Sequence, residues 1–259
     1  QKKPKINIKK YKNNNKLNEN INYSGTNLIY MIDHVNRLSL WVATEILKQP
    51  NTLKRFDMIK YFYMVAKRSY ELRNIHTSTS IFNGILLEPV QRLRRLKKYC
   101  VDDEKIKLLY QHFITLISSN KNYKVYRSQI QTYFLNNNNN DSNPKPCIPY
   151  IPIIIKDLFM IQERLIKKND ENIKLIDLNL LEKNCRHLRR IFETQIRSKL
   201  YSNQIPKDID IQSKIRCNIA TTMDMKSLKK LSLSIQPKLT QEEKENLDMI
   251  ENLEEFGFL

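Results

Sequence analysis

The sequence predicts an all-α fold for one domain of ordinary size. Only 3 of the 259 residues are glycine, which leaves little material for tight β-hairpins. Hydrophobic residues make up 41% of the chain, enough to bury a sizeable core. Along several stretches the apolar residues recur at steps of three and four, the spacing that gathers side chains on one face of an α-helix. We therefore expect amphipathic helices packed around a common core.

The first expected helix starts at Thr26. Residues 1–25 are rich in lysine and asparagine, and their few apolar side chains cannot offset the chain entropy, so we expect a disordered lead. From Thr26 an apolar stripe predicts one long helix that ends at Pro50, with Trp41 in the core. The stripe consists of Leu28, Met31, Ile32, Val35, Leu38, Val42 and Ile46.

Three further helices are expected in the first half of the chain. Thr52 is the expected N-cap of the second helix. A shorter third helix runs from about Thr77 and stops before Pro89. Asp102 and Asp103 start a fourth, because carboxylates stabilise the positive end of the helix dipole. The inward-facing residues of the second and fourth helices are Phe56, Ile59, Phe62, Val65, Ala66, Ile106, Leu109, Phe113, Leu116 and Ile117.

Two long antiparallel helices are expected in the second half. A helix over residues 121–127, KNYKVYR, comes first, followed by a low-complexity mobile loop at residues 136–146. An apolar run then turns amphipathic and reaches Glu163, which predicts the leading arm of a helical hairpin. A return arm is expected at about residues 177–200. It carries Leu181, Leu188, Ile191, Phe192 and Ile196.

The leading arm carries the most specific pattern. Residues 146–163 read PCIPYIPIIIKDLFMIQE. This segment resembles the leading hairpin arm of Ras-type guanine-nucleotide exchange factors (RasGEF catalytic domains), whose pattern is roughly PCIPFLGxYLTDLTFIEE. Further resemblances follow the family order, so residues 26–237 are identified as a RasGEF-like catalytic domain and residues 238–259 as an acidic C-terminal helix or tail. The further segments are His34–Leu47, Glu71–His76, Pro89–Leu93, Lys121–Arg127, Leu175–Gln195 and Leu228–Pro237.

The resemblance implies a guanine-nucleotide exchange factor that speeds GDP release from a Ras-family small GTPase, without covalent chemistry and without a cofactor. The implied partner is preferentially nucleotide-free. On the family register Phe159 occupies space near the nucleotide's magnesium, and Met160 takes this place if the register shifts by one. Glu163, one turn further on, replaces phosphate oxygens. The positions that contact the GTPase are Tyr123, Tyr150 and Lys183.

Each of these residues also has a purely structural interpretation. Phe159 and Leu158 could anchor the arm to the core, and Glu163 could be a solvated helix residue. Tyr123 and Tyr150 are equally consistent with buried structural tyrosines. Taken one at a time, these residues therefore indicate no function.

The chain also departs from the family pattern. Leu86 stands where an asparagine is common, Pro152 where glycine is usual, and Leu180 where lysine is usual. These departures favour the alternative of a catalytically weak helical adaptor, which binds a small GTPase or an acidic membrane surface without exchange activity.

The charge of the chain bears on its partners. A formal charge of +18 and a pI near 9.7 favour an anionic partner. The excess lysine accompanies abundant asparagine and isoleucine, as AT-rich codon usage produces, and there is no zinc-finger spacing, which argues against nucleic acid. An acidic membrane surface is the better candidate, since each basic residue near it contributes on the order of 1 kcal/mol.

The remaining composition favours a cytoplasmic protein, recruited at most to the cytosolic face of a membrane. The four cysteines form no CxxC pair and are expected to be reduced. Cys185 and His187 lie two apart on an expected helix and would not face one ligand, so no metal site is expected. No apolar run approaches the ~20 residues needed to cross a bilayer. Because the chain begins with Gln1, we expect it to be a piece of a longer protein.

Overall fold

The expectation of an all-α fold is confirmed, because the named elements in the described part of the chain are all helices. One isolated bridge, between Asn74 and Ile148, adds an extended contact. The expected lead, the low-complexity loop and the acidic tail fall mainly on residues outside the described ranges. The computed structural model describes residues 26–135, 146–170, 178–202 and 208–238.

Most of the helices follow the apolar periodicity of the sequence. The elements are α1 (Thr26–Leu47), α2 (Thr52–Glu71), α3 (Ile75–Ile85), α4 (Glu88–Gln91), α5 (Arg94–Asp102), α6 (Glu104–Ile117), α7 (Lys124–Leu135), α8 (Ile151–Asp170), α9 (Leu178–Ser202), α10 (Ile209–Ala220) and α11 (Met225–Ile235). The sequence analysis did not predict α5 or α10. Each buries a single apolar side chain, Leu96 in α5 and Ile219 in α10. In α10 the isoleucines Ile211, Ile215 and Ile219 do recur at four-residue steps, a signal that the sequence analysis did not use.

Two helix starts differ from the prediction because asparagine side chains cap them. Asn51, not Thr52, is the N-cap of α2, and its side chain accepts a hydrogen bond from the N–H three residues later at 2.9 Å. Asn74 caps α3 in the same way, accepting from the Thr77 N–H at 3.0 Å. The helix α3 therefore begins at Ile75 and not at Thr77. Asparagine ranks above threonine as an N-cap, which explains both shifts.

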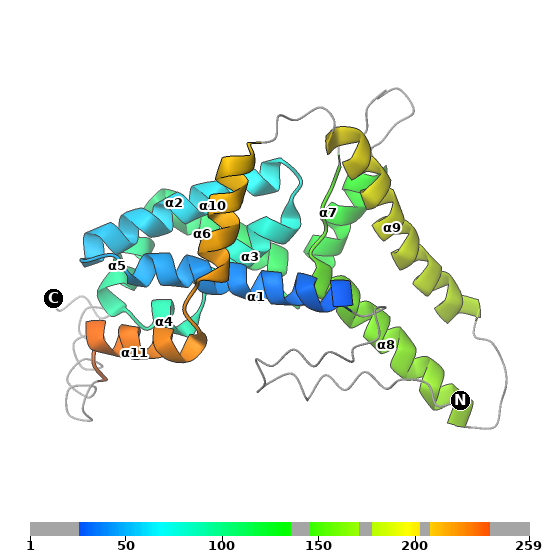
Figure 1. Ribbon diagram of the computed structural model, residues 1–259. Coiled ribbons are helices and arrows are strands. Elements are labelled where there is room, and N and C mark those ends of the chain that lie inside the picture. The colour runs from blue at the N-terminus through cyan, green and yellow to red at the C-terminus, as the bar shows by residue number, and fades with distance from the viewer. Residues whose placement is uncertain (1–25, 136–145, 171–177, 203–207, 239–259) are drawn as a thin grey trace.

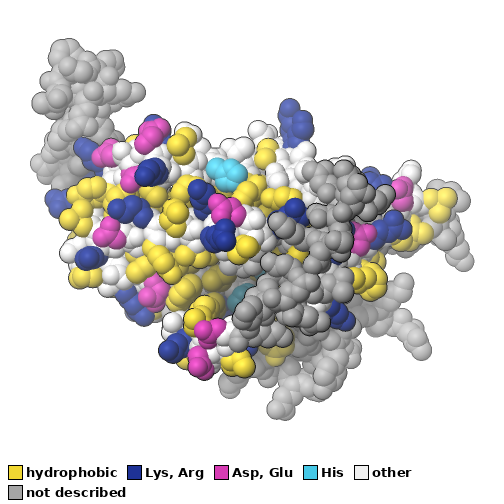
Figure 2. All heavy atoms as spheres, turned by 90° about the horizontal axis from the view of Figure 1, so that it is seen from above, with side chains coloured by type: hydrophobic (Ala, Val, Ile, Leu, Met, Phe, Trp, Pro, Cys, Tyr) yellow, Lys and Arg dark blue, Asp and Glu magenta, His cyan; other side chains and the backbone are white. Residues whose placement is uncertain are grey.

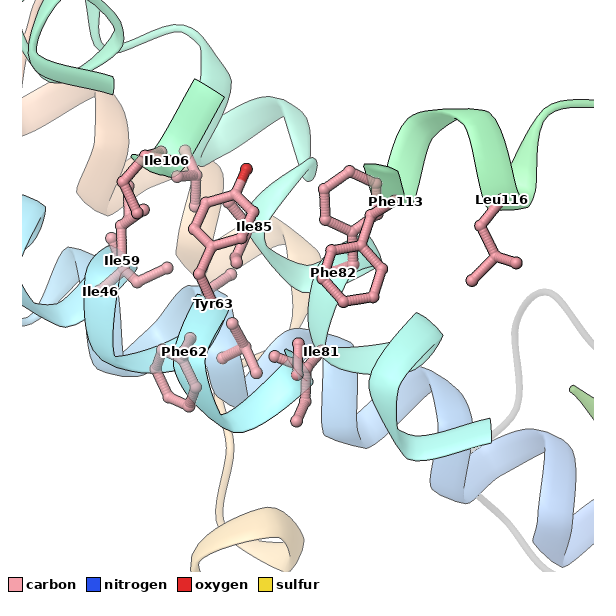
Figure 3. Packing of buried hydrophobic residues seen from close by; sticks show 14 of the residues in the cluster. Ile46, Ile59, Phe62, Tyr63, Ile81, Phe82, Ile85, Ile106, Phe113 and Leu116 are labelled. Atoms are coloured by element: carbon pink, nitrogen blue, oxygen red, sulfur yellow. The ribbon is translucent and has the colours of Figure 1, made fainter. Parts of the chain in front are cut away.

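The central element of the core is α3, which packs against α1, α2 and α6. Figure 3 shows the contact with α6, where the ring of Phe82 stacks on that of Phe113 at a centroid separation of 5.2 Å. Tyr63 of α2 approaches the same Phe82 ring at 6.1 Å. The buried residues of α3 are Ile75, His76, Ser78, Thr79, Ser80, Ile81, Phe82, Gly84 and Ile85.

The apolar stripe predicted for α1 is buried only in its later part. Val35, Leu38, Val42 and Ile46 are buried, whereas Met31 and Ile32 are exposed. The expectation for these last two residues is wrong, since no described helix covers them. Trp41 is half-buried and meets Phe62 of α2 edge-on at 5.5 Å.

The second half of the chain leaves the helical bundle and returns to it. In Figure 1, α8 leads away from the region where α1 begins, and α9 runs back toward α7. The two helices contact each other. After α9 the chain crosses α1 with α10, and α11 then lies against α1 and α4. The segment formed by α8 and α9 thus projects from a bundle formed by the other helices.

The close packing of α1 against α3 depends on Gly84. A β-carbon at this position would lie 2.5 Å from the carbonyl oxygen of Ser39 and 2.7 Å from the β-carbon of Val42. Ser39 strengthens the same contact, because its hydroxyl donates to the carbonyl of Ser80 at 2.8 Å. Any side chain at residue 84 would push the two helices apart.

Gly84→Ala is therefore expected to destabilise the fold even though alanine is the better helix former. Overpacking of this kind typically costs about 1–3 kcal/mol, which exceeds the roughly 1 kcal/mol gained in helix propensity. Urea unfolding followed by circular dichroism measures the change. Thr115→Ala on the exposed side of α6 is the matched control and should change stability little. Equal stability of Gly84→Ala and the parent would show that the helices can separate without cost.

Candidate functional site

The start of α8 is held by the backbone of the segment that precedes α3. The Ile148 N–H donates to the Arg73 carbonyl at 2.9 Å, and the His76 N–H donates to the Ile148 carbonyl at 3.1 Å. Arg73 has a left-handed φ of 59°, which turns the chain into this pairing. Cys147, the residue before Ile148, is buried. The leading arm thus starts from a fixed point on the core.

Two side chains satisfy backbone donors at the N-terminus of α8. The Tyr150 N–H donates to the hydroxyl of Tyr126 at 2.9 Å, and the Ile151 N–H donates to Nδ1 of His76 at 3.4 Å. An imidazole accepts through Nδ1 only when that nitrogen carries no proton. Burial, aided by the nearby His34, lowers the pKa of His76 to about 4, so the ring is neutral at pH 7.

A left-handed turn precedes α7. Lys121, Asn122 and Tyr123 have φ values of 48°, 56° and 59°. For residues other than glycine this conformation costs about 1–2 kcal/mol each. The expected helix over residues 121–127 therefore starts only at Lys124, and its first three residues form the turn. Below, "the Tyr123 turn" denotes residues 121–123.

Arg127 joins the Tyr123 turn to α8. Its Nε donates to the Asn122 carbonyl at 2.7 Å, and its Nη2 donates to the Asn122 side-chain oxygen at 3.3 Å. The same guanidinium donates to both carboxylate oxygens of Asp157 on α8, at 2.7 and 2.8 Å. These bonds with Asp157 raise the pKa of Arg127. Beside them, the Lys156 ammonium lies 4.7 Å from the centroid of the Tyr123 ring.

The leading arm exposes the predicted catalytic residue. Phe159 is 40% exposed, and Met160, next to it, is exposed as well. The arm is anchored by other apolar residues, since Ile153, Ile154 and Ile161 are buried. Phe159 is therefore not part of the buried core. Glu163 lies one turn beyond Phe159 on the same continuous helix and is half-buried.

The predicted GTPase-binding residues are only partly brought together. Tyr123 lies beside α8 through Lys156, and Tyr150 lies immediately before α8. The Tyr150 hydroxyl accepts a hydrogen bond from the Asn83 amide at 3.0 Å, and burial raises its pKa. Lys183 is exposed on α9 and belongs to the other arm. The roles of all five site residues stay predictions.

The sequence analysis missed the residues that hold the site together. Arg127 and Asp157 were both inside quoted segments, yet they lie 30 positions apart and no periodicity relates them. His76 and Tyr126 were missed for the same reason, because they bind the start of α8 from α3 and α7. The available signal for Arg127 and Asp157 was an arginine in one family-like segment and an aspartate in another, since their opposite charges can bind each other.

The return arm turns most of its apolar stripe to solvent. Ile191 is half-buried, and α9 contacts α8. The exposed apolar residues of α9 are Leu178, Leu181, Leu188, Phe192 and Ile196.

The surface shows no metal cluster and no membrane span within the described ranges. No group of three or more His, Cys, Asp and Glu side chains there could hold a metal ion, and no helix there is both long and apolar enough to cross a bilayer. The four cysteines are free thiols. Figure 2 shows basic side chains interspersed with acidic and hydrophobic ones on the face that it presents, without one large basic patch.

Comparison of the sequence with known proteins shows which family the chain resembles. The sequence model of a family described as "RasGEF domain" matches residues 4–187. Ras guanine nucleotide exchange factor Q of Dictyostelium discoideum is 32% identical over 161 residues, which are 60% of this chain and 12% of that protein. Ras guanine nucleotide exchange factor R of the same organism is 27% identical over 181 residues, 70% of this chain and 10% of that protein.

A human protein gives a similar match. Rap guanine nucleotide exchange factor 6 of Homo sapiens is 28% identical over 170 residues, 64% of this chain and 10% of that protein. The chain thus spans about a tenth of the length of these relatives. The family match covers α1 to α8 and ends inside α9, so α10 and α11 lie beyond it.

The His76 contact predicts acid sensitivity. Because the folded state binds a proton at His76 less readily than the unfolded chain, stability should fall as pH drops from about 6.5 to about 4. The contribution of this group is about 1–3 kcal/mol, since one pKa unit corresponds to about 1.4 kcal/mol. Urea unfolding of the parent and of His76→Gln at pH 7.5 and pH 4.5 tests this. The variant should lose less stability on acidification, and parallel losses would contradict the role of His76.

Proposed function

The chain belongs to the RasGEF domain family, and we propose that it is a guanine-nucleotide exchange factor that promotes GDP release from a Ras-family small GTPase. The observation that carries the proposal is an exposed Phe159 on an arm whose anchoring is done by buried isoleucines. Together with the exposed Met160 beside it, Phe159 leaves apolar surface on the arm available for contact with another protein.

Exchange of this kind needs no covalent chemistry. A small GTPase can hold its nucleotide with near-picomolar affinity, about −16 kcal/mol, so spontaneous release is slow. A protein that binds the nucleotide-free GTPase better than the loaded one must, by reciprocity, weaken nucleotide binding by the same factor. The activity is thus differential binding, and no bond in the protein or the nucleotide is broken.

The two residues of α8 would act on different parts of the nucleotide site. Phe159 would fill space beside the magnesium ion and displace oxygen ligands that the ion requires. Glu163, one turn further along α8, would present a carboxylate to the donors that otherwise hold phosphate. Tyr123 and Tyr150 flank the start of α8 and would receive the GTPase surface. Lys183 would reach the GTPase from α9.

The departures from the family pattern are compatible with this arrangement. Pro152 is the second residue of α8, where the missing N–H has no intrahelical acceptor and proline is tolerated. Leu86 ends α3 and packs against the core half-buried. The names of the relatives point to both Ras and Rap GTPases. A fluorescent-GDP release assay over Ras, Rap and Ral types would identify the substrate.

The net positive charge of the chain would favour exchange at a membrane surface. With a formal charge of +18, the chain would be drawn to the acidic face of a membrane, at about 1 kcal/mol for each basic residue near the surface. Lipid-anchored GTPases would meet it there. Attraction of this kind weakens with salt, because exposed charges are screened over about 10 Å at 0.1 M.

The chain should bind a nucleotide-free GTPase far more tightly than the GDP-loaded or GTP-loaded form. Added nucleotide should dissociate the complex, since the two ligands oppose each other by the same coupling free energy. Titration calorimetry or biolayer interferometry with the three states measures this. Equal affinity for all three states would leave the helical adaptor as the function.

Phe159→Ala and Glu163→Ala should each slow catalysed GDP release by roughly tenfold or more, because a lost transition-state contact of ~1.4 kcal/mol is one decade in rate. Their melting temperatures should stay near the parent's, since Phe159 is 40% exposed and Glu163 only half-buried. The assay is fluorescent-GDP release under single-turnover conditions.

Matched controls come from the return arm. Phe192→Ala and Glu182→Ala remove the same residue types from exposed positions of α9 and should exchange at the parent rate. The hairpin mechanism is wrong if Glu163→Ala folds normally and exchanges as fast as the parent.

A further inference from the structure

Arg127 is bound to two segments that contribute different parts of the proposed GTPase-binding surface. Through Asn122 it holds the Tyr123 turn, and through Asp157 it holds α8. Tyr123 belongs to the first segment, and Phe159 follows Asp157 by two residues in the second. One side chain of α7 therefore joins these two segments directly.

The contact between Arg127 and Asp157 is a bidentate ion pair and is therefore directional. Two parallel N–H to oxygen bonds of 2.7 and 2.8 Å fix both the separation and the relative orientation of the groups. The side chains are 28% and 14% exposed. By contrast, Lys229 and Glu88 also link two helices, but at 3.6 Å and with 55% and 60% of their side chains exposed. An exposed and longer contact, such as that between Lys229 and Glu88, keeps two charges near each other but does not fix the angle between their helices.

The turn on the other side of Arg127 needs such support. Three consecutive residues with left-handed φ persist only where their surroundings leave no alternative. Two of the Arg127 donors go to Asn122, the middle residue of the three. The Lys156 contact with the Tyr123 ring, from the residue next to Asp157, closes the connection between the turn and α8.

We propose that Arg127 and Asp157 form a positioning pair, which locks the Tyr123 turn to α8 and sets the direction in which α8 presents Phe159 and Glu163. The consequence for exchange rests on the proposed function, but the effect on the direction of α8 does not. Neither residue needs to touch the GTPase. Their contribution is to hold a protruding helix in one orientation, so that Phe159 and Glu163 meet the nucleotide site of the bound GTPase in the arrangement that releases nucleotide.

The placement of α8 can be followed without any GTPase, through α9, the helix that contacts it. Cys185 on α9 and Cys217 on α10 are exposed, whereas burial raises the pKa of Cys100 and Cys147 to about 11. At pH 7.5 a nitroxide reagent should therefore modify the two exposed thiols. Since α9 contacts α8 and α10 contacts α1, the distance between the two labels reports how the arms sit on the bundle.

The expected result is a narrow distance distribution in the parent chain and a broadened or shifted one in Arg127→Lys. This variant keeps the positive charge but loses the paired N–H donors of the guanidinium that bind both carboxylate oxygens of Asp157. Arg68→Lys is the matched control, because Arg68 pairs with Glu71 within α2 at an exposed site, and its distribution should equal the parent's. An unchanged distribution in Arg127→Lys would overturn the positioning pair, whatever its effect on exchange.

Exchange kinetics, measured together with melting temperatures, distinguish a positioning role of the pair from a purely stabilising one. Arg127→Lys should lower kcat about tenfold with little change in KM, and its melting temperature should stay close to the parent's. The double exchange Arg127→Asp with Asp157→Arg restores an ion pair, so it should be more stable than Asp157→Arg alone. Its kcat should nevertheless stay about tenfold low, because an aspartate at 127 cannot donate to Asn122. Recovery of both stability and kcat would overturn the proposal.

A parent chain that exchanges nucleotide on no GTPase would overturn the proposed function alone. The label distances would then still decide whether Arg127 and Asp157 orient α8.

Discussion

The enclosure of α3 is the constraint on which the rest of the structure depends. Its buried apolar residues are held against α1 by Gly84 and against α6 by Phe82. Because α3 is enclosed by its neighbours, the residues at its N-terminus are held in place. Both Asn74 and His76 lie there. The backbone beside Asn74 and the ring of His76 hold the segment from which α8 starts. The core thereby fixes the origin of the arm that projects from it.

The arm itself is held by polar contacts as well as by burial. Ile153, Ile154 and Ile161 bury one face of α8, while Phe159 and Met160 remain at the surface. What fixes the orientation is a set of directed bonds from α7, through Tyr126 and Arg127. Hydrogen bonds specify an angle where apolar packing tolerates sliding, and a helix whose exposed residues must meet another protein needs that specification. The strain in the Tyr123 turn is part of the same arrangement.

The sequence analysis succeeded where one local pattern decides the structure and failed where two distant segments meet. The stripe over Val35, Leu38 and Val42 predicted the buried face of α1, because a helix that packs must gather apolar residues at its own period. The same stripe wrongly included Met31, since periodicity does not show where the neighbouring helices end. The start of α2 was misplaced by one residue because Asn51 and Thr52 can both cap a helix.

For the site, the sequence by itself determined the family, the all-α class and the placing of Phe159 and Glu163 one turn apart on a single helix. These follow from motifs and from the fixed geometry of an α-helix. Only the tertiary structure decided that Phe159 is exposed, that the α9 stripe faces solvent and that Arg127 reaches Asp157 across 30 residues. Exposure and long-range pairing depend on which surfaces are left uncovered after the helices pack, and that outcome is a property of the whole chain.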